Sequence, residues 1–178
     1  MIDLNQVKQG SMLQTSLTIK PIQKLMIGHA LLMMFVALAI GLLLWVSLLG
    51  GFEIYPGFIL NFNLPGTPEA WARAHRGIPM NSLMVIAFAF AIGGLGFSAK
   101  TENLLGKLFI LTGWANTVFY VASNFSQNRG LSFGDNRFGA GDLFSWVALA
   151  PAYVFGVLSM AAILYVAVKC LTSVSKEN

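Results

Sequence analysis

Four long apolar segments separated by polar connections dominate the chain. Apolar residues run almost without interruption through residues 25–49, 78–99, 104–122 and 143–168. A helix needs about 20 such residues to cross the hydrocarbon core of a bilayer. Apolar and polar residues do not alternate, as they do in the strands of a membrane barrel. The pattern therefore predicts an all-α membrane protein with four transmembrane helices in an antiparallel bundle.

The polar connections predict three regions along the chain. Residues 1–24 form a polar segment, residues 25–168 the four-helix domain, and residues 169–178 a short tail. The first apolar segment is too long for the core of a signal peptide and carries no charge, so we expect it to remain as a spanning helix. The short second connection predicts a tight turn at residues 100–102.

The other two connections, residues 50–77 and 123–142, are long. Their aromatic content favours ordered lids over the alternative, segments that lie in the membrane interface. Thr67 as N-cap and Pro68 at the first helical position predict that the second helix begins at residue 68. Asp142 is predicted as the N-cap of the last helix.

Charge predicts the orientation. Only 10% of the residues are charged and 56% are hydrophobic, whereas a soluble domain carries roughly 25% charged residues. With four spans, the lysine side has a net charge of +4 and the arginine side a net charge of zero. The positive-inside rule therefore places both termini in the cytoplasm. The two sets are Lys8, Lys20, Lys24, Lys100, Lys107, Lys169 and Lys176 on one side, and Arg73, Arg76, Arg129 and Arg137 on the other.

The basic excess does not cluster into a stripe beside aromatics, as it would in a nucleic-acid-binding protein, so no nucleic-acid partner is expected. The single cysteine, Cys170, excludes an intrachain disulfide and a zinc or iron–sulfur site built from several cysteines. Known phosphate-binding and hydrolase motifs are absent from the sequence.

Two histidines are candidate metal ligands. His29 lies in the first span and His75 enters the second from the opposite side, so we expect a full span, on the order of 30 Å, between them. A haem held by both histidines of one chain is thereby excluded, and a metal site would use one histidine and keep an open position. Pro79 should kink the helix after His75, and the kink decides whether Asn81 shares its pocket. The alternative places His75 at the interface and makes Asn81 a helix–helix hydrogen-bonding residue.

A polar stripe follows the third span at four-residue spacing, on one slowly rotating helical face. Polar groups at membrane depth face protein or a cavity. Helix–helix hydrogen bonding explains the stripe equally well, and we interpret Asn116 in that way, while Tyr120 could donate to a substrate oxygen. The stripe consists of Thr112, Asn116, Tyr120 and Asn124.

Two arginines flank His75. Arg73 can pair with Glu69 one helical turn earlier. Arg76, beside a histidine at the membrane boundary, could meet an anionic group such as a haem propionate.

Long stretches of the chain resemble the styrene oxide isomerase family and, more distantly, hydroxylaminobenzene mutases. Two positions depart from the family pattern: Thr112 stands where the family has an acidic residue, and Ser82 where it has glycine. The loss of the acid bears on stereopreference or rate and leaves the reaction class unchanged. The matching stretches are Gly28-His29, LLGGFEIYPG, PGTPEAWARAH with Asn81, GWAN with Phe119-Tyr120, SNFSQNRGLSFGDNRFGAGD and ALAPAYVFGVLSM.

The resemblance implies a homotrimer of four-helix protomers with haem b between neighbouring subunits. It implies that His75 is the axial ligand of the haem iron, and that Asn81 and Tyr120 line the pocket and orient the epoxide. The implied reaction converts aryl epoxides such as styrene oxide into aldehydes such as phenylacetaldehyde. Ferric haem would open the epoxide as a Lewis acid, and a 1,2-hydride shift would follow, which is the Meinwald rearrangement.

Three alternatives remain open from the sequence. They are a hydroxylaminoarene mutase, a b-type haem electron-transfer subunit and a small transporter without a cofactor.

Overall fold

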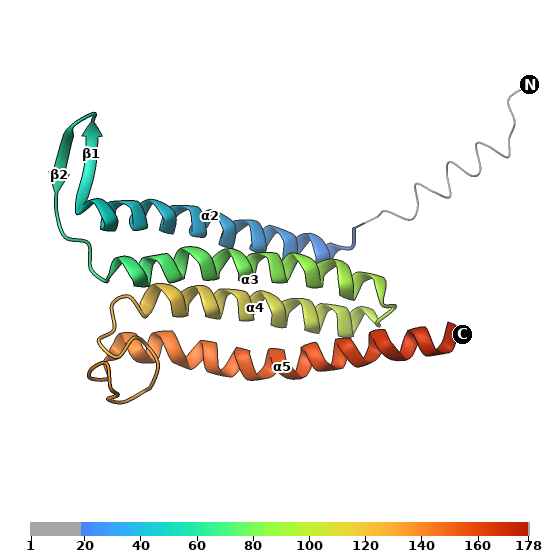
Figure 1. The fold of residues 1–178 in the computed structure, drawn as a ribbon. Coiled ribbons are helices and arrows are strands. Elements are labelled where there is room, and N and C mark those ends of the chain that lie inside the picture. Colours follow the sequence, from blue (N-terminus) through green and yellow to red (C-terminus); the bar gives the residue numbers. More distant parts are fainter. Residues whose placement is uncertain (1–18, 178) are drawn as a thin grey trace, which may run out of the picture.

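The computed structural model describes residues 19–177, and the chain is mostly helical (Figure 1). Most of the predicted N-terminal segment, including Lys8, lies outside the described residues. The predicted tail continues the last helix. The elements are α2 (Pro21–Leu49), β1 (Gly51–Tyr55), β2 (Phe58–Asn61), α3 (Pro68–Gly94), α4 (Ala99–Ala122) and α5 (Leu143–Glu177).

Four helices are long and apolar enough to cross a membrane, as the sequence predicts. They are α2, α3, α4 and the part of α5 over Leu143–Ser173, and they lie side by side in Figure 1. Large apolar side chains cover their outer faces; Phe35 is 70% exposed and Leu164 is 66% exposed. Such faces are stable against lipid and unfavourable in water. The chain is a membrane protein.

The two ends of the helices carry different elements. The start of α2 and the end of α5 lie at one end, which we call the terminal end (Figure 1). The β1–β2 hairpin and the connection of residues 123–142 lie at the other, which we call the hairpin end. The described lysines therefore lie toward the terminal end and the arginines toward the hairpin end.

Both predicted helix starts are confirmed. The Thr67 hydroxyl accepts a hydrogen bond from the backbone N–H of Ala70 at 3.3 Å, and Pro68 is the first residue of α3. Asp142 accepts from the backbone N–H of Ser145 at 2.8 Å, directly before α5. These bonds satisfy N–H groups that have no partner inside the helix.

The predicted turn at residues 100–102 is wrong. These residues form the first turn of α4, and the chain reverses earlier, through Gly96 with its left-handed φ of +65°. The Ser98 hydroxyl accepts from the backbone N–H of Thr101 at 3.2 Å and caps α4. The prediction followed the charged residues, whereas glycine and a capping serine determine where the helix begins.

The first long connection contains a hairpin that the sequence pattern did not predict. β1 and β2 pair antiparallel, with Gly51 opposite Asn61, and the rings of Tyr55 and Phe58 stack at 5.0 Å. The turn passes through Gly57, whose φ of +85° favours glycine. The strands have only five and four residues, too few for their alternation to be distinguished from an irregular aromatic loop.

Small residues let α2 pack closely against α4. A side chain at Gly106 would collide with Ile22 and lie 3.1 Å from the sulfur of Met26, and one at Gly113 would lie 2.8 Å from the sulfur of Met33. Both methionines are fully buried. Close approach at small residues is the usual way in which membrane helices gain packing energy.

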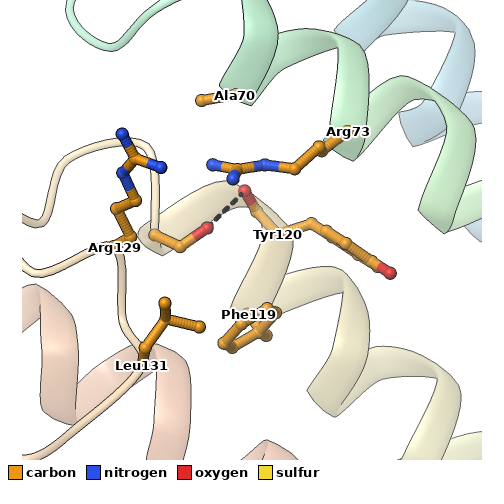
Figure 2. A pocket seen from close by; sticks show the side chains of 7 residues that line it. Ala70, Arg73, Phe119, Tyr120, Arg129 and Leu131 are labelled. Atoms are coloured by element: carbon orange, nitrogen blue, oxygen red, sulfur yellow. Dashed lines mark hydrogen bonds between the residues drawn. The ribbon is translucent and has the colours of Figure 1, made fainter. Parts of the chain in front are cut away.

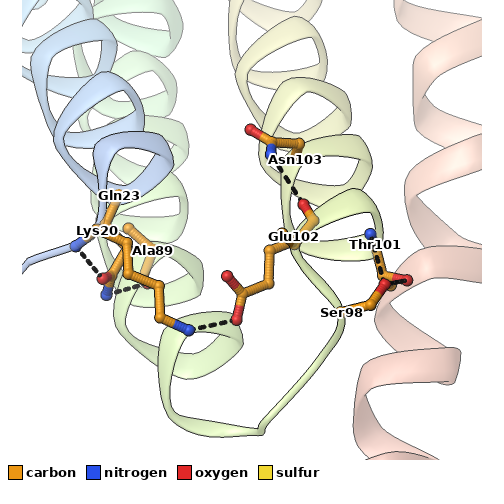
Figure 3. A network of polar contacts seen from close by, with 8 residues as sticks. Lys20, Gln23, Ala89, Ser98, Thr101, Glu102 and Asn103 are labelled. Atoms are coloured by element: carbon orange, nitrogen blue, oxygen red, sulfur yellow. Dashed lines mark hydrogen bonds and ion pairs between the residues drawn. The ribbon is translucent and has the colours of Figure 1, made fainter.

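Polar contacts tie the helices together at the terminal end (Figure 3). The Lys20 ammonium and the buried carboxylate of Glu102 form an ion pair at 2.5 Å. The Gln23 amide donates to the backbone carbonyl of Ala89 at 2.9 Å. These contacts join the start of α2 to α4 and α3.

Candidate functional site

His75 lies two turns inside α3 and packs against α2. Its Nδ1 is 2.9 Å from the backbone carbonyl oxygen of Ala37. A carbonyl only accepts, so Nδ1 carries the proton in this hydrogen bond, and in the neutral ring Nε2 keeps its lone pair. Histidines that bind metals through one nitrogen commonly donate the other N–H to a carbonyl in this way.

Gly41 makes room for the His75 ring. A Cβ atom at this position would lie 2.7 Å from Cε1 and 3.0 Å from Nδ1 of His75, well inside van der Waals contact. Gly41 follows Ala37 by one helical turn, so the two α2 residues contact the same ring. The backbone of α2 therefore fixes both the position and the tautomer of the histidine.

The predicted full-span separation of the two histidines is wrong. Ala37, which contacts His75, follows His29 by only eight residues, about 12 Å along the helix axis. Both helices extend beyond their apolar segments, so each histidine lies two turns inside its helix. His29 accepts at Nδ1 from the indole N–H of Trp114 at 3.1 Å, which directs it toward α4. The two histidines therefore differ in the helix that each contacts: His75 bonds to α2, and His29 bonds to Trp114 of α4.

Asn81 and Asn116 form a hydrogen bond between α3 and α4. The Asn116 amide donates to the side-chain oxygen of Asn81 at 3.1 Å, and the Asn81 amide donates to the backbone carbonyl of Gly77 at 3.0 Å. Asn116 therefore acts between helices, as predicted. Asn81 shares that role, which the sequence left as an alternative.

Tyr120 packs over Gly77. A Cβ atom at position 77 would overlap the phenol ring, so the glycine provides the space that the ring occupies. Gly77 follows His75 by two residues, which places it about 200° around the α3 axis. Within one protomer, Tyr120 and Asn81 thus lie together on the α4 side of α3, while His75 contacts α2.

Of the two arginines that flank His75, Arg73 does not form the ion pair with Glu69 that the sequence suggested. Arg76 is exposed, and its Nε donates to the carbonyl of Ala72 at 3.3 Å. In the part of the chain that the structure describes, the one ion pair joins Lys20 to Glu102, so the expected Glu69–Arg73 pair is not formed.

The two residues that depart from the family pattern bond to backbone carbonyls. The fully buried Ser82 hydroxyl donates to Ala30 at 2.7 Å and ties α3 to α2. The Thr112 hydroxyl donates to Leu108 at 2.9 Å and lies 3.3 Å from the carbonyl of Phe155 in α5. Both hydroxyls therefore serve helix packing.

The last residue of the stripe, Asn124, lies two residues beyond the end of α4. Its amide donates to the carbonyl of Tyr120 at 2.9 Å, and its buried side-chain oxygen has no partner among the described residues. Beyond it, the fully buried Asn128 organises the third connection: it donates to the carbonyls of Ser132 and Gly134 and accepts from the N–H of Gly130. This connection is thus ordered, as expected.

Asp142 closes the third connection. The backbone N–H of Ser145 lowers the pKa of its carboxyl below the ordinary value, with a smaller contribution from the N–H of Gln127. Both hydrogen bonds favour the ionised form.

Within residues 19–177 no group of three or more His, Cys, Asp or Glu side chains could hold a metal ion. His75 can supply one nitrogen ligand, so an iron at this place would need its other ligands from a macrocycle. One fixed imidazole with a free Nε2 fits the single axial ligand of a haem.

Sequence reasoning missed the α2 residues that hold His75 and the glycine under Tyr120. Gly41 and Gly77 interrupt apolar or helical segments, and an isolated glycine in a helix indicates close approach of a neighbour. That signal was available, but it does not say which neighbour approaches. Ala37 acts only through its backbone carbonyl, so no residue type could reveal it.

Two comparisons with known proteins place the chain in a family. The sequence model described as styrene oxide isomerase matches residues 22–171. A curated styrene-oxide isomerase of Pseudomonas fluorescens is 56% identical over 156 residues, which cover 88% of this chain and 92% of the relative. The match includes all four helices and both long connections. The chain is an isomerase and belongs to the styrene oxide isomerase family.

Proposed function

We propose that this membrane isomerase converts aryl epoxides, with styrene oxide as the reference substrate, into the corresponding aldehydes. The name of the Pseudomonas relative supports the substrate class. The main support for His75 as the metal ligand is the hydrogen bond from its Nδ1 to the Ala37 carbonyl, which leaves Nε2 free to bind a metal.

The cofactor that fits this histidine is haem b with ferric iron, and Arg76 is the residue proposed to meet its propionates. When bound, the haem supplies a Lewis acid that promotes heterolytic opening of the benzylic C–O bond. The aryl ring stabilises the positive charge at the benzylic carbon. A hydride then shifts from the neighbouring carbon, and the oxygen becomes the aldehyde oxygen. No oxidant or reductant is consumed.

The chain contributes orientation and the exclusion of water. Tyr120 and Asn81 are proposed to orient the epoxide through hydrogen bonds, with the second amide hydrogen of Asn81 as its remaining donor. The helices around them are apolar, and water would trap the cation as a diol. A pocket poor in water and acids therefore favours the rearranged product.

We further propose a homotrimer in the bacterial inner membrane, with antiparallel helices, both termini cytoplasmic and the haem between subunits. Within one protomer, His75 faces α2, whereas Tyr120 and Asn81 lie between α3 and α4. This separation supports a site in which the histidine of one copy meets the pocket residues of a neighbouring copy. The lysines at the terminal end support the orientation. Reporter fusions to the C-terminus should read cytoplasmic, and a periplasmic signal would refute the orientation.

The test compares His75→Ala with His29→Ala in purified protein. We expect His75→Ala to lose the Soret band of the haem and the conversion of styrene oxide. His29→Ala should keep the haem, because Nδ1 of His29 already accepts a hydrogen bond from the indole N–H of Trp114. A normal haem spectrum in His75→Ala would refute the ligand assignment. Assays with hydroxylaminobenzene would distinguish the epoxide isomerase from a mutase.

A further inference from the structure

Two arginine side chains from different parts of the fold face one another at the hairpin end (Figure 2). Arg73 comes from the second turn of α3, and Arg129 from the connection between α4 and α5. Both line a cavity of about 130 Å³, together with Phe119, Ser123 and Leu131. They also line a neighbouring cavity of about 470 Å³ that reaches Gln127.

Neither guanidinium forms an ion pair with a carboxylate of the described residues. The one ion pair in this part of the chain joins Lys20 to Glu102. Glu69 lines the larger cavity without forming an ion pair with either arginine. The nearby Asp142 accepts from the N–H groups of Gln127 and Ser145. Asp135, in the same connection, accepts from the N–H of Gly141 at 2.9 Å. Glu69 therefore offsets part of the positive charge of the two arginines through space, while neither guanidinium forms a direct ion pair with a carboxylate among the described residues.

Arg129 has an unusual backbone conformation. Its φ is +62°, a left-handed value that residues other than glycine rarely adopt. The N–H of Gly130 donates to Asn128 at 2.9 Å and supports this conformation. The Arg129 guanidinium stacks on Phe138 at 4.1 Å, and Arg137 lies 4.6 Å from the same ring. Backbone strain of this kind is concentrated at sites that bind ligands or do chemistry.

Arg73 lies within reach of the lipid headgroups. α3 has 27 residues, so it is about 40 Å long and extends roughly 5 Å beyond each side of a 30 Å hydrocarbon core. Arg73 lies five residues after Pro68, about 7.5 Å along the axis, so its backbone lies about 2.5 Å inside the hydrocarbon boundary. A long arginine side chain spans that distance and places its guanidinium among the headgroups.

We propose that Arg73 and Arg129 bind a phosphate group, carried by the headgroup of a phospholipid in the leaflet at the hairpin end. Paired guanidiniums bind phosphate oxygens through two parallel hydrogen bonds each. A phosphate here is not a reactant in the proposed epoxide opening, so its binding can be measured without turnover. The cavity nevertheless borders the proposed reaction site, because Tyr120 also lines it. Arg73 lies on the α4 side of α3, whereas His75 contacts α2.

The experiment titrates the full-length protein, purified in a maltoside detergent and depleted of lipid, with two probes. The first is dihexanoyl phosphatidylglycerol and the second is inorganic phosphate, and binding is followed by native mass spectrometry and by thermal stabilisation. The variants are Arg73→Gln and Arg129→Gln. Lys107→Gln, an exposed residue of α4 toward the terminal end, removes the same charge as a control. Glu69→Gln removes the neighbouring negative charge.

We expect each arginine variant to weaken phospholipid binding by about ten-fold or more, because a hydrogen bond to a charged group is lost. Lys107→Gln should bind as the original protein does, and Glu69→Gln should bind more tightly. Equal affinity for inorganic phosphate would support the phosphate site and identify a soluble source.

Unchanged binding of both probes in Arg73→Gln and Arg129→Gln would overturn the proposal. Loss of haem from these variants with unchanged lipid binding would also overturn it, because the arginines would then serve the cofactor. If an arginine variant fails to fold, the Glu69→Gln variant still tests the proposal. Unchanged phospholipid affinity after removal of the Glu69 charge would contradict a phosphate bound beside Glu69.

Discussion

Replacing Gly41 by alanine should displace His75, because the new methyl group occupies space that the imidazole fills. Its carbon would lie 2.7 Å from Cε1 of the ring, whereas carbon atoms pack at about 3.5–4.0 Å. The ring must therefore move by about 1 Å, which breaks or stretches the 2.9 Å hydrogen bond to Ala37.

Three terms determine the stability of Gly41→Ala. Alanine is favoured over glycine inside a helix by about 0.5–1 kcal/mol. Overpacking costs roughly 1–3 kcal/mol, and the lost hydrogen bond costs about 0.5–1.5 kcal/mol. The net loss is centred near 2 kcal/mol, which lowers the melting temperature by roughly 4–8 °C for a chain of this length.

Gly28→Ala is a matched control on the same helix, because a Cβ atom there meets nothing within 4 Å. It should leave the melting temperature unchanged or raise it. The assay is thermal unfolding of both variants in the same detergent, followed by haem content and the position of the Soret band. Under the proposed function, Gly41→Ala loses haem and Gly28→Ala keeps it. Equal melting temperatures and equal haem content in the two variants would refute the role of Gly41 in placing the histidine.

Three further predictions concern single side chains. Asn81→Ala and Asn116→Ala should each lower stability by about 0.6–2 kcal/mol, and the double variant should lose less than the sum, because both remove one hydrogen bond. Tyr120→Phe should keep the fold and the haem while turnover of styrene oxide falls by up to about 100-fold; full activity would exclude positioning by its hydroxyl. Hydrogen bonds lower the folded-state pKa of Asp142, so its stabilisation is present above its ordinary pKa of 3.8 and is lost as the pH falls through the lower folded value. The melting temperature should therefore depend less on pH in Asp142→Asn, measured between pH 5 and 2.

Helix number and helix starts could be predicted because they depend on local chemistry. An apolar segment of sufficient length spans a bilayer whatever its neighbours are, and Thr67, Pro68 and Asp142 cap helices through bonds within one turn. The turn before α4 was misplaced because Gly96 and Ser98 outweigh the charged residues that follow them. The β1–β2 hairpin was missed because its strands are too short to show a period.

The site could be predicted only as a set of residue types, because one helix presents its faces to two neighbours. Residues 73, 77 and 81 of α3 are each four apart and drift by only about 40° per step, so Arg73, Gly77 and Asn81 form a continuous strip toward α4. His75 lies about 200° away and meets α2. Spacing along α3 gives these angles but not the partners of His75. The carbonyl of Ala37 has no signal in the sequence, and the glycine at position 41 indicates a close neighbour without identifying it. Substitutions on α2 should therefore act on the histidine alone, while substitutions on α4 act on Tyr120 and Asn81, and the two groups of effects should be additive within one protomer.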